Sequence, residues 1–215
     1  MISSYDNARK QMVREQLSAR NIDDARVLAA MDAVAREVFV PAELQGLAYH
    51  DRPLPIGADQ TISQPYIVAL MAQALSLKGT ETLLEVGGGC GYSAAVYSHL
   101  TAKVDSYEIV PELAEHAKAN IENVGSKNVQ IFAGDATAIE GHELYDAISV
   151  AAAPAHVPKA LVKLLKNGGR MVIPVGPLHQ SQTLMLITKD EDGHLSERPL
   201  CAVGFVPLIS HPNRP

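Results

Sequence analysis

Seven residues, Glu85 to Gly91, read Glu-Val-Gly-Gly-Gly-Cys-Gly and constrain the fold more than any other stretch of this chain. They follow the apolar segment 82–84 and precede a segment, 92–100, that is expected to be helical. Glycines between a strand and a helix let the backbone turn tightly and let a ligand lie against bare amides at the helix N-terminus. The next expected strand ends on Glu108, about 20 residues past the glycine turn. At this separation, open α/β sheets use an acidic residue to bind ribose hydroxyls. We therefore expect a nucleoside-type ligand at the carboxyl ends of these strands.

Strand and helix patterns alternate from Thr82 onward, after a helical N-terminal region. Two amphipathic helices are expected around 8–17 and 27–38, the second capped by Asp23 or Asp24, followed by a long ordered loop over 49–65 and a helix over 65–75. The strands are expected at 82–86, 103–108, 128–133, 145–150, 170–175, 184–188 and 199–207. The later helices are expected at 111–123 and 157–166, with Lys166 to Gly169 ending the last one, and a hairpin-type turn at 190–193.

This order predicts an α/β fold with a doubly wound, mostly parallel sheet, antiparallel strands at one edge and N-terminal helices. We expect residues 1–78, the N-terminal helices and a substrate and cofactor loop, to pack on a core of residues 79–215. The 215 residues would then form one compact domain.

Composition narrows the possible partners. The net charge of −6, without any run of Lys or Arg, argues against nucleic-acid binding. We expect no membrane partner, since no apolar stretch is long enough to span a bilayer and no signal-peptide pattern opens the chain. With only Cys90 and Cys201, a disulfide framework is not expected and a cytoplasmic location is. The eight histidines lack paired ligand spacing, so no metal site is expected. A monomer is the favoured state.

The glycine segment by itself is compatible with NAD or S-adenosylmethionine (AdoMet), since residues 89–94 fit the loose G-x-G-x-x-G/A pattern. Glu85, just before the first glycine, favours AdoMet: a carboxylate there can face a cationic methionine moiety and would repel a pyrophosphate. Asp135, after Gly134 at the end of the third strand, can hold an adenine amino edge together with the next amide, that of Ala136. Glu108 suits both cofactors.

Several motifs together resemble one family. They are Thr-Ile-Ser-Gln-Pro-Tyr at 61–66, Leu-Glu-Val-Gly-Gly-Gly-Cys-Gly-Tyr at 84–92, Tyr-Asp-Ala-Ile at 145–148, Ala-Ala-Ala-Pro at 151–154 with Pro158, Gly-Gly-Arg at 168–170, Ile-Pro-Val-Gly at 173–176 and Phe-Val-Pro-Leu at 205–208. In order and spacing this set is similar to the protein-L-isoaspartate O-methyltransferase family, from the N-terminal helices to Leu208. The resemblance implies a single Rossmann-like, AdoMet-dependent methyltransferase domain.

The resemblance also implies a reaction. The free α-carboxylate of an L-isoaspartyl residue, in a damaged peptide or protein, would take the methyl group of AdoMet and leave S-adenosyl-L-homocysteine. The ester would then close to a succinimide, which can reopen as aspartate, and repair would begin. The carboxylate is ionised at neutral pH and the donor is already a sulfonium, so neither a general base nor a metal is needed.

Site residues follow from the same resemblance. Ser63 is expected to contact the reacting carboxylate as the catalytic residue, and Val206, Pro207 and Leu208 to bind the substrate peptide along the backbone. The residues expected to bind the cofactor are Gln60, Thr61, Ile62, Glu85, Gly87, Gly88, Gly89, Glu108, Asp135 and Ala136. Two other interpretations stay open: Ser63 as an N-cap of the helix that begins at Pro65, and 206–208 as an ordinary edge strand.

The chain departs from the family pattern at the third strand, where the usual G-D-G-x-x-G has Ala136 and Ile139 in place of its later glycines. Val68 and Ile209 stand where relatives often carry histidine and a polar residue. These departures mark a divergent member, with a bulkier and more apolar wall expected beside the adenine. The alternatives are a methyltransferase of the same fold with another acceptor, a non-catalytic nucleoside-binding protein and an NAD-linked oxidoreductase.

Overall fold

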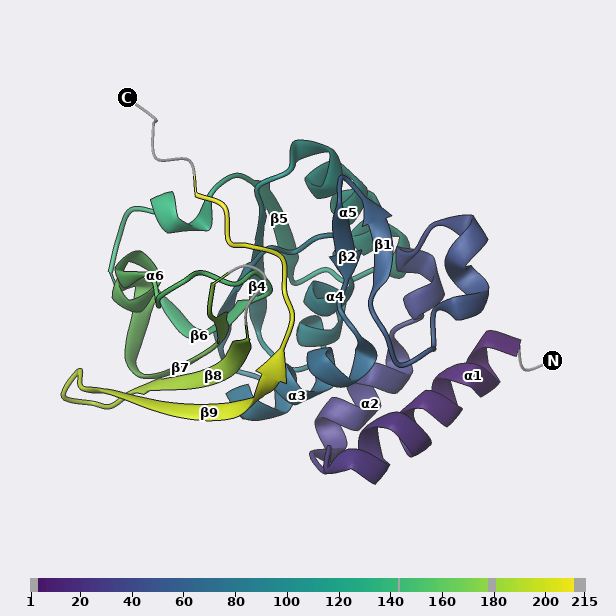
Figure 1. Cartoon of the computed structure of the whole chain (residues 1–215), viewed down its shortest axis with the longest axis horizontal. Helices are drawn as coiled ribbons and strands as arrows, with labels where there is room; N and C mark the ends of the chain where they lie inside the picture. The colour runs from purple at the N-terminus through teal and green to yellow at the C-terminus, as the bar shows by residue number, and fades with distance from the viewer. Residues whose placement is uncertain (1–3, 143, 178–180, 211–215) are drawn as a thin grey trace.

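A computed structural model places the alternating segments in one seven-stranded sheet with helices packed on it (Figure 1). It describes residues 4–142, 144–177 and 181–210; the extreme ends of the expected domain, 1–3 and 211–215, lie outside these ranges. The strand order is β5-β4-β3-β6-β7-β8-β9. The first five strands in that order run parallel, whereas β8 and β9 are antiparallel at one edge, as the sequence predicts.

The bounds of the sheet strands are β3 Thr82–Val86, β4 Lys103–Glu108, β5 Val129–Ala133, β6 Tyr145–Val150, β7 Leu165–Val175, β8 Gln182–Lys189 and β9 Leu195–Val203. A separate hairpin pairs β1 Leu54–Gly57 with β2 Gln60–Ile62. The α-helices are α1 Ser4–Met12, α2 Ala25–Ala33, α3 Pro65–Leu75, α4 Tyr92–Ser98, α5 Pro111–Val124 and α6 Lys159–Leu164. Short π or 3-10 helices cover Val13–Leu17, Ser18–Arg20, Arg36–Phe39, Ala42–Leu47 and Ala136–Ala138.

Successive side chains of the central strand, β3, belong to two different hydrophobic clusters. Leu83 packs with the N-terminal helices and α3 to α5, whereas the neighbouring Leu84 packs with α6 and the inner face of β7. Successive side chains of a strand point to opposite faces, so β3 contributes to both clusters. The sheet is therefore covered on both faces, as is usual for parallel strands in α/β proteins.

Asp24, one of the two residues expected to cap the second helix, does so: its carboxylate accepts the N–H groups of Arg26 and Val27. The helix itself is shorter than expected, because it ends at Ala33 and a 3-10 helix, Arg36–Phe39, follows. None of the described helices has the length and apolar character needed to cross a bilayer.

Two expectations near Gly168 and Gly169 are wrong. The helix expected over 157–166 is only Lys159–Leu164, and the residues expected to end it belong to β7. The register between β6 and β7 passes from Leu165 to Arg170 while β6 advances only from Tyr145 to Ala147, so the glycine pair forms a bulge. Gly168, with φ 76°, takes the conformation that such an irregularity needs.

The long loop expected over 49–65 contains the β1–β2 hairpin. Its two-residue turn is Ala58 and Asp59, which have φ of 49° and 55°, and this pair lacks the glycine that usually marks such a turn. The last strand also differs: β9 ends at Val203 rather than reaching residue 207. The chain after it, yellow in Figure 1, turns back across the sheet, and Pro207 forms a parallel bridge with Ala153.

Candidate active site

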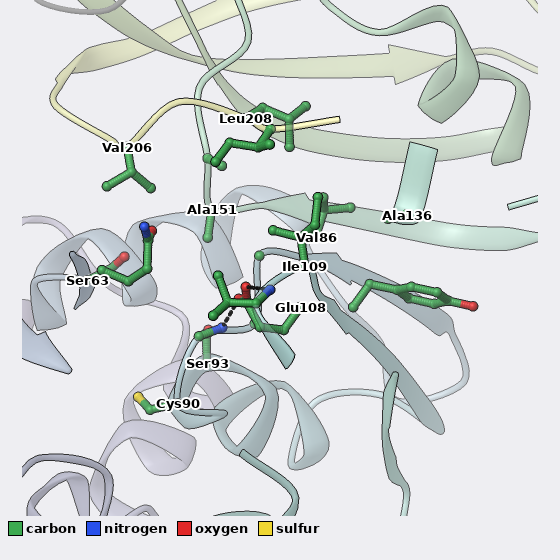
Figure 2. A pocket seen from close by; sticks show the side chains of 18 of the residues that line it. Ser63, Val86, Cys90, Ser93, Glu108, Ile109, Ala136, Ala151, Val206 and Leu208 are labelled. Atoms are coloured by element: carbon green, nitrogen blue, oxygen red, sulfur yellow. Dashed lines mark hydrogen bonds between the residues drawn. The ribbon is translucent and has the colours of Figure 1, made fainter. Parts of the chain in front are cut away.

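A cleft of about 850 Å³, partly open to solvent, lies at the carboxyl ends of β3, β4, β5 and β6. Figure 2 shows Glu108 near its centre, Ser63 and Val206 on one side and Ala136 on the other. The glycine loop, the β2 segment, the end of β5 and the returning segment after β9 all contribute to its lining. Apart from Glu85, every site residue expected from the sequence lines this cleft: Gln60, Thr61, Ile62, Ser63, Gly87, Gly88, Gly89, Glu108, Asp135, Ala136, Val206, Pro207 and Leu208.

The glycine loop owes its shape to backbone conformation and close contact. Gly87 and Gly89 have φ of 81° and 56°, and Gly91, which precedes α4, has φ of 88°. The N–H groups of Gly87 and Gly88 both donate to the carbonyl of Tyr107, at 2.8 and 3.1 Å. The loop is thereby fixed to the end of β4, with its glycines facing the cleft.

Glu85 is the exception to the expected site. It is fully buried, and its carboxylate accepts the Ser106 hydroxyl at 2.5 Å and the Ser93 hydroxyl. Burial raises the pKa of this carboxyl group. Because the side chain lies beneath the loop rather than in the lining, the expectation that Glu85 faces the ligand is corrected: Glu85 supports the loop from below. Its strand direction explains this, since Glu85 shares a sheet face with Leu83, toward α4.

Glu108 ends β4 and is 5% exposed, yet it lines the cleft. Its two carboxylate oxygens accept the N–H groups of Gly89, at 2.7 Å, and Val110, at 2.9 Å (Figure 2). These bonds hold the carboxylate in one orientation and leave each oxygen a further lone pair for a donor in the cleft. A buried, oriented carboxylate of this kind can accept two adjacent hydroxyl groups.

Ala136 lies across the cleft from Ser63 (Figure 2), and Asp135 directly precedes it after the end of β5. One carboxylate oxygen of Asp135 accepts the N–H group and the hydroxyl of Thr137, at 2.8 and 2.7 Å, and so caps the 3-10 turn that begins at Ala136. Ala136 is 3% exposed. The turn presents a carboxyl group and a first-turn amide to the same side of the cleft, the pair expected for an adenine edge.

The loss of glycines at Ala136 and Ile139 leaves the backbone unstrained. Ile139 has φ of −64°, Ala136 is not among the residues with positive φ, and Ile139 packs against the cluster around α6. The backbone conformation at these two positions therefore does not require glycine. Ala136 lines the cleft, whereas Ile139 packs against the cluster around α6 and is not part of the lining, so only Ala136 adds a side chain to this wall.

Ser63 follows β2 and lies in the cleft lining (Figure 2). The N-cap of α3 is Gln64, without a side-chain capping bond, so the capping interpretation of Ser63 is wrong. Within the described residues, its hydroxyl has no hydrogen-bond partner, which leaves it available to a ligand. A second hollow begins at the same place: Thr61, Ser63, Ala151 and Val206 line both.

The segment 206–208 is held by main-chain bonds to one residue. Ala153 donates its N–H to the Val206 carbonyl at 2.8 Å and accepts the Leu208 N–H at 2.9 Å. Upstream, the Gln182 side chain bonds both the N–H and the carbonyl of Phe205, at 2.6 and 3.1 Å. The segment is therefore not part of β9, and the edge-strand interpretation is wrong. Together with Gly204 and Phe205 it forms a fixed segment beside both hollows, called the strap 204–208 below.

Several lining residues were missed by sequence reasoning. Ile109 and Val110 follow Glu108, and Tyr107 precedes it. Their position at the carboxyl end of a strand was the sequence signal that could have identified them as lining residues. Cys90 also lines the cleft, and burial raises the pKa of its thiol to about 11, so it is protonated at neutral pH. Val68 and Ile209, noted above as departures, are lining residues too.

Among the described residues, one potential metal-ligand group occurs; it lies away from the cleft, in the exposed β8–β9 turn, and consists of Asp190, Asp192 and His194. The Asp190 carboxylate accepts the N–H groups of Asp192 and His194 at 3.0 and 2.8 Å. The expected hairpin-type turn is present, and these bonds stabilise it.

A parallel sheet of this order, with its glycine loop and acidic strand end, defines a Rossmann-like methyltransferase fold of the AdoMet-dependent class, to which similar solved structures belong. Residues 7–213 match the family model described as protein-L-isoaspartate(D-aspartate) O-methyltransferase. The chain belongs to this family.

Individual relatives support the assignment. The chain is 46% identical over 202 residues to a protein-L-isoaspartate O-methyltransferase of Methanoculleus marisnigri, covering 94% of this chain and 91% of that one. It is 48% identical over 210 residues to a protein-L-isoaspartate O-methyltransferase 2 of Pelobacter propionicus, covering 97% and 93%. A Plasmodium falciparum protein named as a protein-L-isoaspartate O-methyltransferase, solved with S-adenosyl-L-homocysteine, has a TM-score of 0.79 at 27% identity, covering 94% of this chain and 98% of that one.

Proposed function

We propose that this protein transfers the methyl group of AdoMet to the free α-carboxylate of L-isoaspartyl residues in peptides and proteins. The observation that carries the proposal is the shared wall of the two hollows. Ser63 lies in that wall, between a cleft suited to a nucleoside and the second hollow, which Gly204 and Phe205 also line. A group entering from the second hollow would meet a ligand in the first at Ser63.

The first hollow fits AdoMet. Glu108 offers a fixed carboxylate for ribose hydroxyls, and Asp135 with the Ala136 amide offers an acceptor and a donor for an adenine edge. The glycine loop at the start of α4 brings bare backbone close to the remaining part of the ligand. When bound, AdoMet supplies an activated methyl group on a sulfonium.

The second hollow fits a peptide. Its remaining lining is Pro53, Gln64, Ile67, Ala202, Val203, Gly204 and Phe205, without a charged side chain. The strap 204–208 exposes backbone beside it, and backbone contacts accept peptides of many sequences. We propose that Val206, Pro207 and Leu208 bind the substrate along the backbone and that the Ser63 hydroxyl donates to the reacting carboxylate.

Catalysis would then rest on orientation. A carboxylate with an ordinary pKa near 4 is ionised at neutral pH and needs no base. Two groups beside the cleft are unsuited to act as a base: Glu85 is buried beneath the loop, and the Cys90 thiol is protonated. Ser63 and the fixed strap would hold the acceptor in line with the methyl group, the kind of positioning that accounts for large rate effects.

The direct test is transfer of tritium from methyl-labelled AdoMet to an isoaspartyl peptide and to its normal aspartyl twin. We expect base-labile label on the isoaspartyl peptide alone. Label on both peptides would show that the acceptor need not be an isoaspartyl residue. Label on neither peptide, with AdoMet bound, would favour a non-catalytic nucleoside-binding protein.

We further propose that the protein acts in the cytoplasm as a monomer, with residues 1–78 and 79–215 working as one unit. Cys90 and Cys201 are both free thiols, which suits a reducing compartment. One hydrophobic cluster contains residues from both parts, among them Met12, Met31, Leu83 and Tyr92. Light scattering during size-exclusion chromatography tests the monomer, and a single melting transition tests the single unit.

A further inference from the structure

Arg36 is an arginine buried in the protein interior with almost none of its hydrogen-bonding capacity used. It lies in the 3-10 helix Arg36–Phe39 and is 0% exposed. Its Nε donates to the Ala48 carbonyl at 2.7 Å, while Nη1 and Nη2 have no partner among the described residues. A buried charge without a carboxylate is unfavourable for folding, so its presence at this place calls for a reason beyond stability.

The flat face of Arg36 lies over a residue of the cofactor cleft. Its guanidinium carbon is 4.7 Å from the centroid of the Tyr92 ring, a cation–π contact. Tyr92 is the first residue of α4, directly after the glycine loop, and it lines the cleft. Phe39 meets the same ring edge-on, with centroids 5.5 Å apart, so the ring is held from two sides.

The other end of Arg36 fixes the chain that leads to Ser63. Ala48, which accepts the Nε donor, precedes Tyr49, and the Tyr49 hydroxyl accepts the Arg36 backbone N–H at 3.2 Å. The segment then runs through the β1–β2 hairpin to Thr61 and Ser63. Arg36 thus contacts Tyr92, which follows the glycine loop, and Ala48, which lies in the segment that leads to Ser63. Both segments contribute residues to the lining of the cleft.

The hairpin also lies beside the glycine loop. A Cβ added to Gly89 would lie 3.2 Å from the Ile56 side chain of β1. Their relative placement decides how Ser63 faces a ligand that rests on the glycines. A single rigid group that holds both segments would set that placement.

We propose that Arg36 is a positioning residue that fixes the glycine-loop wall, through Tyr92, relative to the Ser63 wall, through Ala48. The part that concerns the glycine loop rests on cofactor binding alone. The part that concerns Ser63 rests on the proposed methyl transfer.

Arg36→Met tests this, because methionine is apolar, of similar length and free of an unpaired charge. We expect the melting temperature to stay or rise, since replacing an unpaired buried charge by an apolar group is often neutral or stabilising. We expect calorimetric affinity for S-adenosyl-L-homocysteine to fall about 30-fold, the size of a desolvated cation–π contact. Single-turnover methyl transfer to an isoaspartyl peptide, at saturating AdoMet, should fall about 100-fold, as expected for displaced reacting groups.

The matched control is Arg170→Met. Arg170 also donates to backbone carbonyls, those of Leu75 and Ser76 at 2.9 and 3.1 Å, but it does not line either hollow. It should lose melting temperature and keep affinity and turnover. The same pattern in Arg36→Met would overturn the proposal and show Arg36 to be a support of the fold only.

If Arg36→Met cannot be purified folded, Arg36→Lys keeps the charge but loses the planar face over Tyr92 and the Nε donor to Ala48. A folded Lys variant with weaker affinity and slower transfer supports the proposal, and one with unchanged values overturns it. Should the wild-type protein methylate no isoaspartyl peptide, the proposed function fails, while the affinity measurement still decides the part that concerns the glycine loop.

Discussion

Gly88 lies so close to Ser106 that a Cβ at position 88 would come within 2.2 Å of the Ser106 hydroxyl oxygen. That hydroxyl is bonded to Glu85, which pairs with Ser106 in the register of β3 and β4. The loop therefore rests directly on a buried polar pair. A side chain at Gly88 must either displace the loop or break the bond between Ser106 and Glu85.

Gly88→Ala should destabilise the protein by about 1–3 kcal/mol, the usual range for overpacking, and weaken binding of S-adenosyl-L-homocysteine. Urea denaturation and calorimetry measure the two effects. Gly46→Ala is the control, since a Cβ at Gly46 meets nothing within 4 Å and its φ is not positive. Adding Ser106→Ala removes the clashing atom, so the double variant should be more stable than the sum of the singles by about 0.5–3 kcal/mol. Strict additivity would show that Ser106 is not the obstacle.

Glu108→Ala should weaken binding of S-adenosyl-L-homocysteine by about 1.5–3 kcal/mol, the typical value of hydrogen bonds to a charged group, which is about 10- to 150-fold. The variant removes the acceptor for a ribose and also frees the Gly89 and Val110 N–H groups that order the loop. Calorimetry measures the change. Glu112→Ala, an exposed acid in the first turn of α5, should bind as the wild type does. Equal affinity in the Glu108 variant would remove Glu108 from the site.

Ser63→Ala should slow methyl transfer about 10- to 100-fold, because acceptor orientation is lost. Ligand affinity and melting temperature should stay near the wild-type values, since Ser63 caps no helix. Single-turnover rates and thermal melts on the same sample separate these quantities. Asp24→Ala is the opposite case: it removes the cap of α2, so about 1 kcal/mol of stability should be lost with turnover intact.

Glu85 should impose a pH dependence on stability. Burial raises its pKa in the folded state above the unfolded value of about 4.3, so the folded protein binds more protons than the unfolded chain between those two values. The free energy of unfolding then falls as the pH rises through that window: the contribution of Glu85 is complete below the unfolded pKa and lost above the folded one.

Glu85→Gln should remove this component, because glutamine does not titrate and its side chain can still bond Ser93 and Ser106. Urea denaturation at pH 5 and pH 8 measures it: the drop in stability between the two should be smaller in the variant. If the free energy of unfolding changes by the same amount in the wild-type protein and in the variant, the assignment to Glu85 is wrong.

The glycine loop, Glu108 and Asp135 could be predicted from the sequence because each is fixed by its own strand and the turn after it. The bulge at Gly168 and Gly169 could not, since a glycine pair after a helical pattern equally indicates a helix end. The β1–β2 hairpin could not be predicted either, because Ala58 and Asp59 occupy turn positions that glycine or asparagine usually fills.

The other features that the sequence did not predict depend on contacts between segments that are distant in the chain. The burial of Glu85 depends on Ser106 and Ser93, neither adjacent in sequence, so local pattern could not tell a ligand contact from a support. The strap 204–208 leaves β9 because Ala153 and Gln182 bond it, which no periodicity in the strap itself encodes. Likewise, the role of Arg36 becomes visible only when Ala48 and Tyr92 are seen on either side of it.

The bonds between Ala153 and the strap have a consequence for synthesis on the ribosome. A domain folds as a unit, and the strap lies among the last residues of the chain to be made. A nascent chain that has reached only β8 therefore lacks Val206, Pro207 and Leu208, which line the cleft. The cleft is completed only after the C-terminal segment has left the ribosome, so an unfinished enzyme does not act on the nascent chains around it.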